Sequence, residues 1–414
     1  MTPPNNNNNN NNMPQQPVAT QGTAREVFGA FLKLGLTSFG GPIAHLGYFR
    51  TEFVERRRWL DDRSYSDLVA LCQFLPGPAS SQVGMALGLG RAGWPGLLAA
   101  WAGFTLPSAI ALILLALSIT QYQHLAQAGW VHGLKIVAVA IVAQAVWGMV
   151  KSLCPDRPRA ALGFLAALLT LVLPLAIGQV TAIAIAGLLG WWCLQPTQNS
   201  RSQAHNYPVS RRLGMAALIA FVTLLIGLPL WAAITGSSTL ALLEGVYRAG
   251  ALVFGGGHVV LPLLQSAVVP NGLVSNADFL AGYGAAQAVP GPLFTFSAFL
   301  GAISNGALHG WAGGLVLLAV IFLPAFLILI GALPFWEDLR HRASIQTAMA
   351  GINAGVVGIL GAALYDPLWT SAILNKTDFG LALLCFGLLT VGRVPPALVV
   401  LLAGVMGWTM GMAS

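Results

Sequence analysis

Apolar residues dominate the chain from about residue 27 to about residue 412, in about thirteen runs that short polar stretches separate. Each run approaches the roughly 20 residues that an α-helix needs to cross the hydrocarbon core of a bilayer, or is somewhat shorter. The polar stretches between the runs are too short to hold a large soluble domain. The pattern therefore predicts an all-α polytopic membrane protein.

An Asn-rich tail precedes the apolar runs. Residues 1–24 hold an unbroken Asn tract with Pro and Gln, a composition that cannot bury a core and that predicts disorder. We assign this tail no function. It has neither the basic region nor the apolar region of a cleaved signal, so the first spans are expected to direct the chain to the membrane.

Two glycine- and proline-rich motifs occur in both halves of the chain. FGGP at 39–42 returns as FGGG at 254–257, and PGP at 76–78 returns at 290–292. All four copies interrupt apolar sequence, where Gly and Pro break a helix. Lipid offers no hydrogen bonds to a backbone opened in this way, so such breaks are tolerated only where protein or a polar cavity receives the freed groups. The doubled breaks therefore indicate a transport pathway.

The motifs belong to a longer internal repeat. We predict an N-terminal repeat over 25–195 and a C-terminal repeat over 244–414, each with about six apolar segments. The stretch 196–243 between them holds a basic loop and one linker helix. An even number of segments followed by a single linker helix inverts the second repeat in the membrane.

The distribution of basic residues supports this inversion, because Lys and Arg accumulate in short cytoplasmic loops. Arginines occupy positions 56–58, whereas the matching loop at 268–277 has no basic residue. Conversely, the stretch 121–130 has none, while its counterpart holds Arg340 and Arg342. We therefore predict a cytoplasmic N-terminus and an external C-terminus.

The broken segments allow two arrangements. About thirteen full spans would place the arginines at 56–58 outside, whereas about nine full spans with four re-entrant helical hairpins place them inside. The hairpins also put each break at a hairpin tip. We favour the hairpins, and both arrangements remain open.

Composition and motifs exclude other classes of protein. The 414-residue chain is 56% hydrophobic and 8% charged, whereas soluble globular domains are about 25% charged. The net charge of +7 comes mostly from short loops, so we expect no nucleic-acid partner. The chain has no phosphate-binding, metalloprotease or hydrolase motif, and its four cysteines lack CxxC spacing. We expect no enzyme activity, no ATP-driven pumping, no metal and no cofactor.

The four breaks are the candidate binding site. Inverted repeats whose discontinuous helices meet near the midplane are the recurring plan of secondary transporters. A helix that restarts after a break presents unpaired N–H groups and about half a positive charge, which favours an anion. The alternative is that Gly and Pro only permit close helix packing. The predicted backbone contacts are Gly40, Gly41, Pro42, Pro76, Gly77, Pro78, Gly255, Gly256, Gly257, Pro290, Gly291 and Pro292.

Hydroxyls and cations near the breaks extend this site. Ser80 and Ser81 follow the first PGP motif, and Thr295 follows the second, so the first half is expected to provide more polar contacts. Lys33 and Arg248 occupy matching places before the first break of each half. They either attract the anion or extend their charge to the membrane interface.

Two glutamines and two histidines complete the candidate set. Gln73 and Gln287 match each other in the repeat and either line the site or satisfy freed carbonyls. His45 and His258 follow the first breaks without matching each other. Each either couples protons to transport or bonds an opened backbone as a neutral ring.

The stretches 38–45, 73–78, 253–258 and 290–292 together closely resemble the chromate ion transporter family in its long, two-domain form. The resemblance covers nearly everything after about residue 25. It implies a multi-pass protein of the bacterial inner membrane that exports chromate from the cytoplasm, confers chromate resistance and is driven by the proton motive force.

The residues alone lead to an anion-selective secondary transporter and not to chromate. Sulfate is also a tetrahedral dianion, so hydrogen-bond donors arranged for chromate should largely suit sulfate as well. We therefore expect sulfate to compete with chromate. A passive anion channel and a sulfate or other oxyanion uptake transporter remain as alternatives. Protons and the lipid bilayer are the other expected partners, and the oligomeric state, a homodimer included, stays open.

Overall fold

The computed structural model of the chain describes residues 22–39, 41–121, 129–173, 175–195, 207–254, 257–336 and 342–413. These residues form helices, turns and loops, with no strand among them, which confirms the all-α prediction. Most of the predicted Asn-rich tail lies outside the described residues, as do Gly40, Gly255 and Gly256 of the predicted site.

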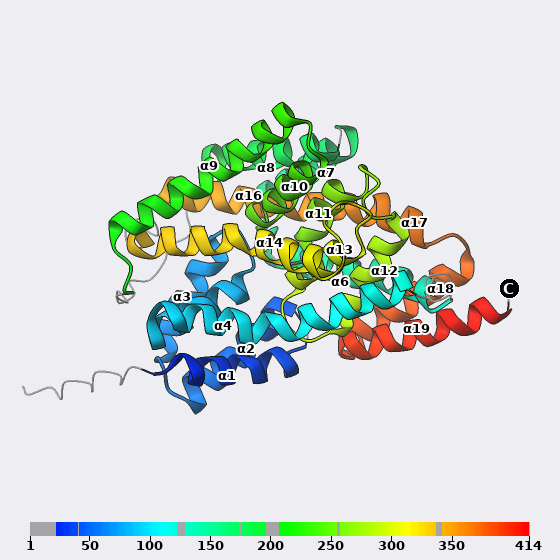
Figure 1. Cartoon of the computed structure of the whole chain (residues 1–414). Coiled ribbons are helices and arrows are strands. Elements are labelled where there is room, and N and C mark those ends of the chain that lie inside the picture. Colours follow the sequence, from blue (N-terminus) through cyan, green and yellow to red (C-terminus); the bar gives the residue numbers. More distant parts are fainter. Residues whose placement is uncertain are drawn as a thin grey trace, which may run out of the picture.

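The helices fall into two groups separated by α9 (Arg211–Thr235). The first half contains α1 (Ala24–Thr37), α2 (Gly41–Phe49), η1 (Arg50–Arg56), α3 (Asp62–Phe74), α4 (Ala79–Gln121), α6 (Gly129–Leu153), α7 (Arg157–Val172) and α8 (Leu175–Cys193). The second half contains α10 (Ser238–Ala251), η2 (Gly257–Val259), α11 (Val260–Val268), α12 (Asn276–Ala288), η3 (Leu293–Thr295), α13 (Phe296–Ile303), α14 (Gly310–Ala332), η4 (Leu333–Phe335), α16 (Ala343–Ala363), η5 (Leu364–Trp369), α17 (Thr370–Ala372), α18 (Lys376–Thr390) and α19 (Pro396–Ala413). Figure 1 shows the two groups against each other, with α9 along one edge.

Matching helices of the two halves begin with matching caps. The Thr23 side chain accepts the N–H of Glu26 at the start of α1, and the Ser237 side chain accepts the N–H of Leu240 at the start of α10. Asp61 caps α3 in the same way that Ser275 caps α12. A side-chain oxygen in this place satisfies a backbone donor that the helix leaves unpaired. The repeat therefore sets where these short helices begin.

The first two helical segments form a hairpin that returns to its starting side. α1 has 14 residues and reaches only about 21 Å, less than the roughly 30 Å of hydrocarbon. The ring of Phe53 in η1 stacks on Phe31 of α1 at 4.8 Å, so the second arm runs back along the first. Arg91 lies at the open end, where its carbonyl accepts the N–H of Gly22 and its guanidinium lies 5.4 Å from the Trp59 ring.

The next two segments form a second hairpin on the same side. α3 has 13 residues, and the chain leaves helical geometry at Ala92 and Gly93 inside α4. α4 therefore consists of a short arm over 79–91 and a long helix over 94–121. Gly88 and Gly96 face each other so closely that a Cβ on either would meet the carbonyl of the other, which folds the arm back against the long helix.

The second half repeats both hairpins. A Cβ at Gly245 of α10 would lie 2.6 Å from the Cβ of Ala267 near the end of α11, so these helices are antiparallel. Gly301 of α13 and Gly313 of α14 make the same close contact as the glycine pair inside α4. The helix lengths and contacts support the re-entrant hairpins over full spans for the broken segments.

The longer helices exchange partners between the halves. α6 packs against α18 and α19 of the second half, and its counterpart α16 packs against α7 and α8 of the first half. Gly133 of α6 lies against the Ala403 carbonyl, and Gly351 of α16 lies against the Ala186 carbonyl. The first contact runs from the first half to the second, and the second contact runs from the second half to the first. A pseudo-two-fold axis between inverted repeats requires such equivalent contacts.

Five helices among the described residues are long and apolar enough to cross a bilayer: Ala79–Gln121, Gly129–Leu153, Arg211–Thr235, Gly310–Phe335 and Ala343–Ala372. α7 and α18 have 16 and 15 residues, which reach only about 24 Å and about 22 Å. Length alone therefore does not establish nine full spans. The protein is nevertheless a helical membrane protein by the length and composition of its helices.

The two ends of the described chain lie at opposite ends of the molecule. In Figure 1, α1 begins at the left of the view and α19 ends at the right. The arginines at 56–58 follow the first hairpin. Arg57 lies 5.8 Å from the Trp59 ring, which Arg91 also contacts, and Arg91 bonds Gly22, so these arginines lie near the start of α1. Opposite termini fit the inverted repeat, and which end is cytoplasmic stays a prediction.

The helix exchange predicts a sharp difference between two glycines of α6. Gly133→Ala forces a methyl group into the Ala403 carbonyl, and overpacking of this kind costs about 1–3 kcal/mol. Gly148 has open space around the position of a Cβ, so Gly148→Ala gains only the higher helix propensity of Ala. In detergent, the melting temperature should fall for the first variant and stay constant or rise for the second. Equal melting temperatures would contradict the packing at Gly133.

Candidate functional site

Two backbone hydrogen bonds join the four breaks across the two halves. The N–H of Gly77 donates to the carbonyl of Val253 at 2.7 Å, and the N–H of Gly291 donates to the carbonyl of Ser38 at 3.0 Å. Each bond therefore runs from the PGP motif of one half to the residue before Phe-Gly-Gly in the other. We call this reciprocal pair of bonds the clasp. It satisfies backbone groups that the broken helices leave open at membrane depth.

The clasp requires glycine at both donors. Gly77 has φ of 114° and Gly291 has φ of 102°, a region that residues with a Cβ rarely adopt. A Cβ at Gly291 would also lie 2.8 Å from Ser108 Oγ, and one at Gly77 would lie 3.3 Å from the Cβ of Ala325. Those two neighbours lie near the middle of the long part of α4 and of α14, so the clasp lies near the middle of the bundle.

The other breaks close around the clasp. A Cβ at Gly257 would lie 3.3 Å from Pro42 Cγ and 3.8 Å from Leu293 Cβ, so three of the four breaks meet at this point. The structure thus brings the predicted Gly and Pro positions together where it describes them. Their role in binding a substrate stays a prediction.

The first half surrounds the clasp with buried polar groups. Ser80, Ser81 and Gln82 begin the short arm of α4 and are at most 3% exposed. Ser80 Oγ lies 3.4 Å from Nδ1 of His45, which is also buried, and Gln82 Nε2 donates to the Pro76 carbonyl. Gln82 thus bonds the first PGP motif itself, and His45 contacts the helix start that follows it.

Several of these polar groups have unused hydrogen-bonding capacity. Among the described residues, no partner contacts Ser38 Oγ, Ser81 Oγ, Gln82 Oε1 or Thr105 Oγ1, all of them buried. Buried polar atoms in proteins are nearly always bonded to protein, water or a ligand. The first turn of α4 also presents unpaired backbone N–H groups at this place. The three hydroxyls and the N–H groups can donate to a ligand with several acceptor atoms, whereas Gln82 Oε1 can only accept.

The hydroxyls that follow the second PGP motif bond their own helical turns. Thr295 Oγ1 donates to the Pro292 carbonyl at 2.7 Å, and Ser297 Oγ donates to the Phe294 carbonyl at 2.8 Å. His258 Nδ1 lies 2.7 Å from the hydroxyl of Tyr283. The free hydroxyls therefore lie in the first half, on the side where the sequence predicts more polar contacts, whereas the second half keeps the buried amide donor Gln287 Nε2 without a partner among the described residues.

The predicted cations stand in different surroundings. Arg248 Nε lies 3.2 Å from Glu244 Oε1, one helical turn away, so this charge already has a partner. Lys33 is exposed on α1. Neither residue is therefore a buried cation without a partner, and both remain candidates only through longer-range attraction of an anion.

The two matched glutamines differ in exposure. Gln73 is exposed, whereas Gln287 is partly buried on α12. The residues that sequence analysis left outside the site are Ser38, Gln82, Thr105 and Tyr283. Ser38 and Gln82 lie beside predicted residues in the chain. Thr105, on the long part of α4, and Tyr283, on α12, are far from them in the chain and carry no signal in the sequence.

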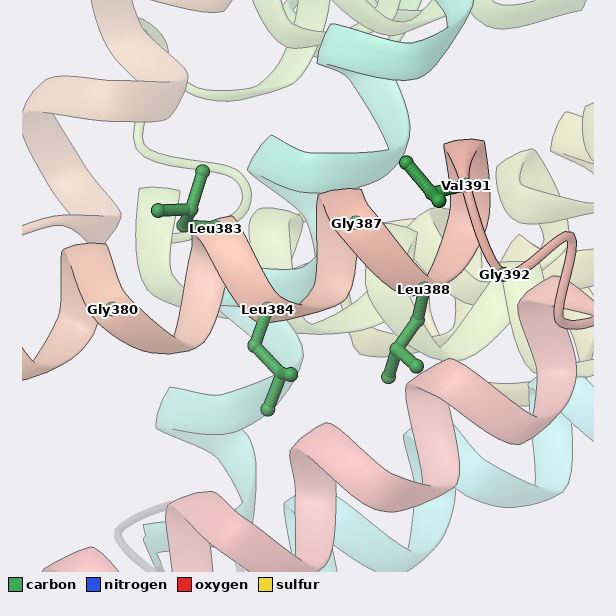
Figure 2. Close-up of a pocket in the computed structure, with 7 residues that line it drawn as sticks. All are labelled: Gly380, Leu383, Leu384, Gly387, Leu388, Val391 and Gly392. Carbon is green, nitrogen blue, oxygen red and sulfur yellow. The ribbon is translucent and has the colours of Figure 1, made fainter.

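One surface groove lies away from the breaks. Figure 2 shows it along α18, lined by Gly380, Leu383, Leu384, Gly387, Leu388, Val391 and Gly392. None of these side chains can donate a hydrogen bond to an anion. Among the described residues, no group of three or more His, Cys, Asp or Glu side chains could hold a metal ion.

Comparison with known proteins now identifies the family. A model of the chromate transporter family matches residues 25–191 and 240–408. The chain belongs to the chromate transporter family. The whole linker helix α9 lies between the two matched stretches.

Relatives of this transporter cover most of its length. The chromate transport protein of Pseudomonas aeruginosa is 26% identical over 92% of this chain and 91% of its own length. The chromate transport protein of Cupriavidus metallidurans is 26% identical over 83% of this chain and 82% of its own. An uncharacterized transporter of Methanocaldococcus jannaschii is 26% identical over 82% of this chain and 83% of its own. No solved structure matches the chain.

The clasp predicts that two distant glycines act alike. Gly77→Ala and Gly291→Ala force a Cβ into a backbone conformation that costs on the order of 1–3 kcal/mol. Each should reduce transport by about tenfold or more, measured as the initial rate in proteoliposomes at equal protein content. Gly236→Ala is the matched control, since Gly236 also has positive φ but ends α9 with open space around it. Loss of transport in only one of the two clasp variants would contradict the reciprocal arrangement.

Proposed function

We propose that this transporter exports chromate from the cytoplasm and so confers chromate resistance. Membership of the chromate transporter family and the names of two long relatives support chromate as substrate. The observation that carries the proposal is the cluster of buried donors at the start of α4, beside the clasp. Ser81 Oγ is central to it because it is buried and has no partner among the described residues.

Chromate would bind through hydrogen bonds and helix ends. Its four oxygens would accept from Ser80, Ser81 and the N–H groups that follow Pro78, with N–H groups after Pro42, Gly257 and Pro292 completing the shell. Oriented N–H groups favour a dianion at a helix start without a counter-charge in contact. The second half would contribute mainly its backbone, since its hydroxyls bond their own helical turns.

The proton motive force would drive the export. Its electrical part acts directly on a dianion, because moving two negative charges out of a compartment held at −100 mV releases about 4.6 kcal/mol. His45 is the candidate for coupling to protons, since its ring lies beside Ser80 in the same site. No ATP-hydrolysing domain is needed for this mechanism.

The proposed setting is a bacterial inner membrane with the N-terminus in the cytoplasm. The arginines at 56–58 support it, since they lie at the same end as the start of α1 and basic loops stay inside. The donor set recognises tetrahedral geometry and charge, so sulfate should compete with chromate. Passive channel conduction and sulfate uptake are the outcomes that the flux experiment below would reveal instead.

The experiment is chromate flux in proteoliposomes with imposed gradients. Concentrative chromate movement should require a pH gradient or a membrane potential, collapse with protonophore and weaken when sulfate is added. Strictly downhill flux with high unitary conductance would identify a channel. Accumulation of sulfate in preference to chromate would identify an uptake transporter for sulfate.

The asymmetry of the site gives a mutational test. Ser81→Ala removes a hydrogen bond to a charged ligand, an interaction worth about 1.5–3 kcal/mol, so the KM for chromate should rise about tenfold or more. Ser297→Ala is the matched control, because that hydroxyl bonds the Phe294 carbonyl, and its KM should stay unchanged. If Ser80→Ala/Ser81→Ala leaves both export and affinity intact, the asymmetric site is wrong.

A further inference from the structure

The two halves differ in the exposure of one helical face. On α3, Ser66, Ala70 and Gln73 form a continuous exposed face that we call the α3 stripe. Its counterparts on α12, 214 positions later, are Leu280, Gly284 and Gln287, where the first two are buried and the third is partly buried. The same face of the same repeated helix is therefore open in one half and covered in the other.

α12 is covered by α6 and α19. Gly284 lies so close to α6 that a Cβ there would clash with the Leu134 carbonyl. At the start of α12, the Asp278 carboxylate attracts Lys135 of α6. The matching helices for α3 are α16 and α8, and among the described residues α3 makes no extended contact with either.

α16 nevertheless carries a surface that matches the one on α6. The equivalent contacts of Gly133 and Gly351 with Ala403 and Ala186 align α6 with α16, 218 positions apart. Ile352 then matches Leu134 and is only partly buried. Asn353 matches Lys135, and its Oδ1 is buried with no hydrogen-bond partner among the described residues.

The pair that would meet there is complementary. Ser64 of α3 is the counterpart of Asp278. Its hydroxyl donates to Asp61 Oδ2 in the described conformation, and after docking it would turn to the open acceptor of Asn353, in the place where a carboxylate faces an ammonium in the other half. Ala70 is small enough to approach the Ile352 backbone as Gly284 approaches that of Leu134. The α3 stripe and α16 thus have the chemistry of an interface that the present conformation leaves unformed.

We propose that the α3 stripe docks on α16 in a second conformation, in which α12 leaves α6. The described conformation is open on the side of α3 and closed on the side of α12. Inverted repeats make the two arrangements equivalent, so each half can adopt the packing of the other. This inference rests on the proposed transport function. In that function, the exchange is the step that moves access to the site from one face of the membrane to the other.

Cysteine labelling tests the described conformation first. In a variant with Cys72, Cys154, Cys193 and Cys385 replaced, Ser66→Cys and its counterpart Leu280→Cys are each added alone and exposed to a charged maleimide from both faces. Ser66→Cys should label at least about tenfold faster than Leu280→Cys. Slow labelling at Ser66→Cys would overturn the proposal, because the stripe would then face lipid or a second copy of the chain.

A wedge on one side then tests the exchange on the other. Gly284→Leu cannot fit against Leu134 and should release α12 from α6, so labelling of Leu280→Cys should rise and labelling of Ser66→Cys should fall about tenfold. Gly148→Leu is the control wedge, since open space surrounds Gly148, and should change neither rate. If Leu280→Cys opens while Ser66→Cys keeps its rate, the halves move independently and the proposal fails.

Crosslinking provides a second measurement that needs no wedge. Ala70→Cys with Ile352→Cys should form a disulfide under mild oxidation as the protein visits the docked state, whereas Ala70→Cys with Gly361→Cys should not. Equal yields for the two pairs would overturn the proposal. These measurements need no chromate, so they can be made whether or not the protein transports it. If the conformational exchange is seen but chromate flux is not, only the proposed function is contradicted. If chromate flux is seen but the exchange is not, only this inference is contradicted.

Discussion

An opened backbone in a membrane must find a hydrogen-bond partner within the protein, and the arrangement of this transporter depends on how that requirement is met. Each half breaks its helices twice. The clasp pairs a donor from one half with a carbonyl from the other, twice over. Neither half can satisfy these two pairs of groups alone, so the breaks force the halves to share one centre. The helix ends around that centre become available to a substrate as a consequence.

Close glycine packing lets the rest of the bundle follow the same symmetry. α6 and α16 exchange partners between the halves through Gly133 and Gly351, each set against an alanine carbonyl of the opposite half. In a bilayer, apolar helices gain little from meeting each other instead of lipid, so close backbone approach and interhelical bonds hold them together. Small residues therefore have two different roles in this protein. Near the clasp they interrupt helices, and elsewhere they let the backbones of two helices approach closely.

Symmetry of the backbone contrasts with asymmetry of the chemistry. The first half places unpartnered hydroxyls and an amide oxygen beside the clasp, whereas the second half fills the same places with Phe294 and Phe296 and bonds Thr295 to its own turn. A symmetric frame can alternate between two arrangements of similar energy. Because the polar residues beside the clasp lie mainly in the first half, most of the predicted side-chain contacts with the substrate stay in that half in either conformation.

The sequence by itself determined the fold class, the doubled breaks and their inversion, because each depends on local features: apolar run length, Gly and Pro in those runs, capping residues and the side on which Arg accumulates. It also placed Ser80 and Ser81 near the site, since they directly follow a break. Only the tertiary structure gave the contacts that support hairpins over full spans, and only it showed that Glu244 pairs with Arg248, that Tyr283 contacts His258 beside a break, and that the α3 stripe is open while its counterpart is covered. Those facts depend on contacts between residues far apart in the chain, and one sequence without relatives carries no record of which distant residues meet.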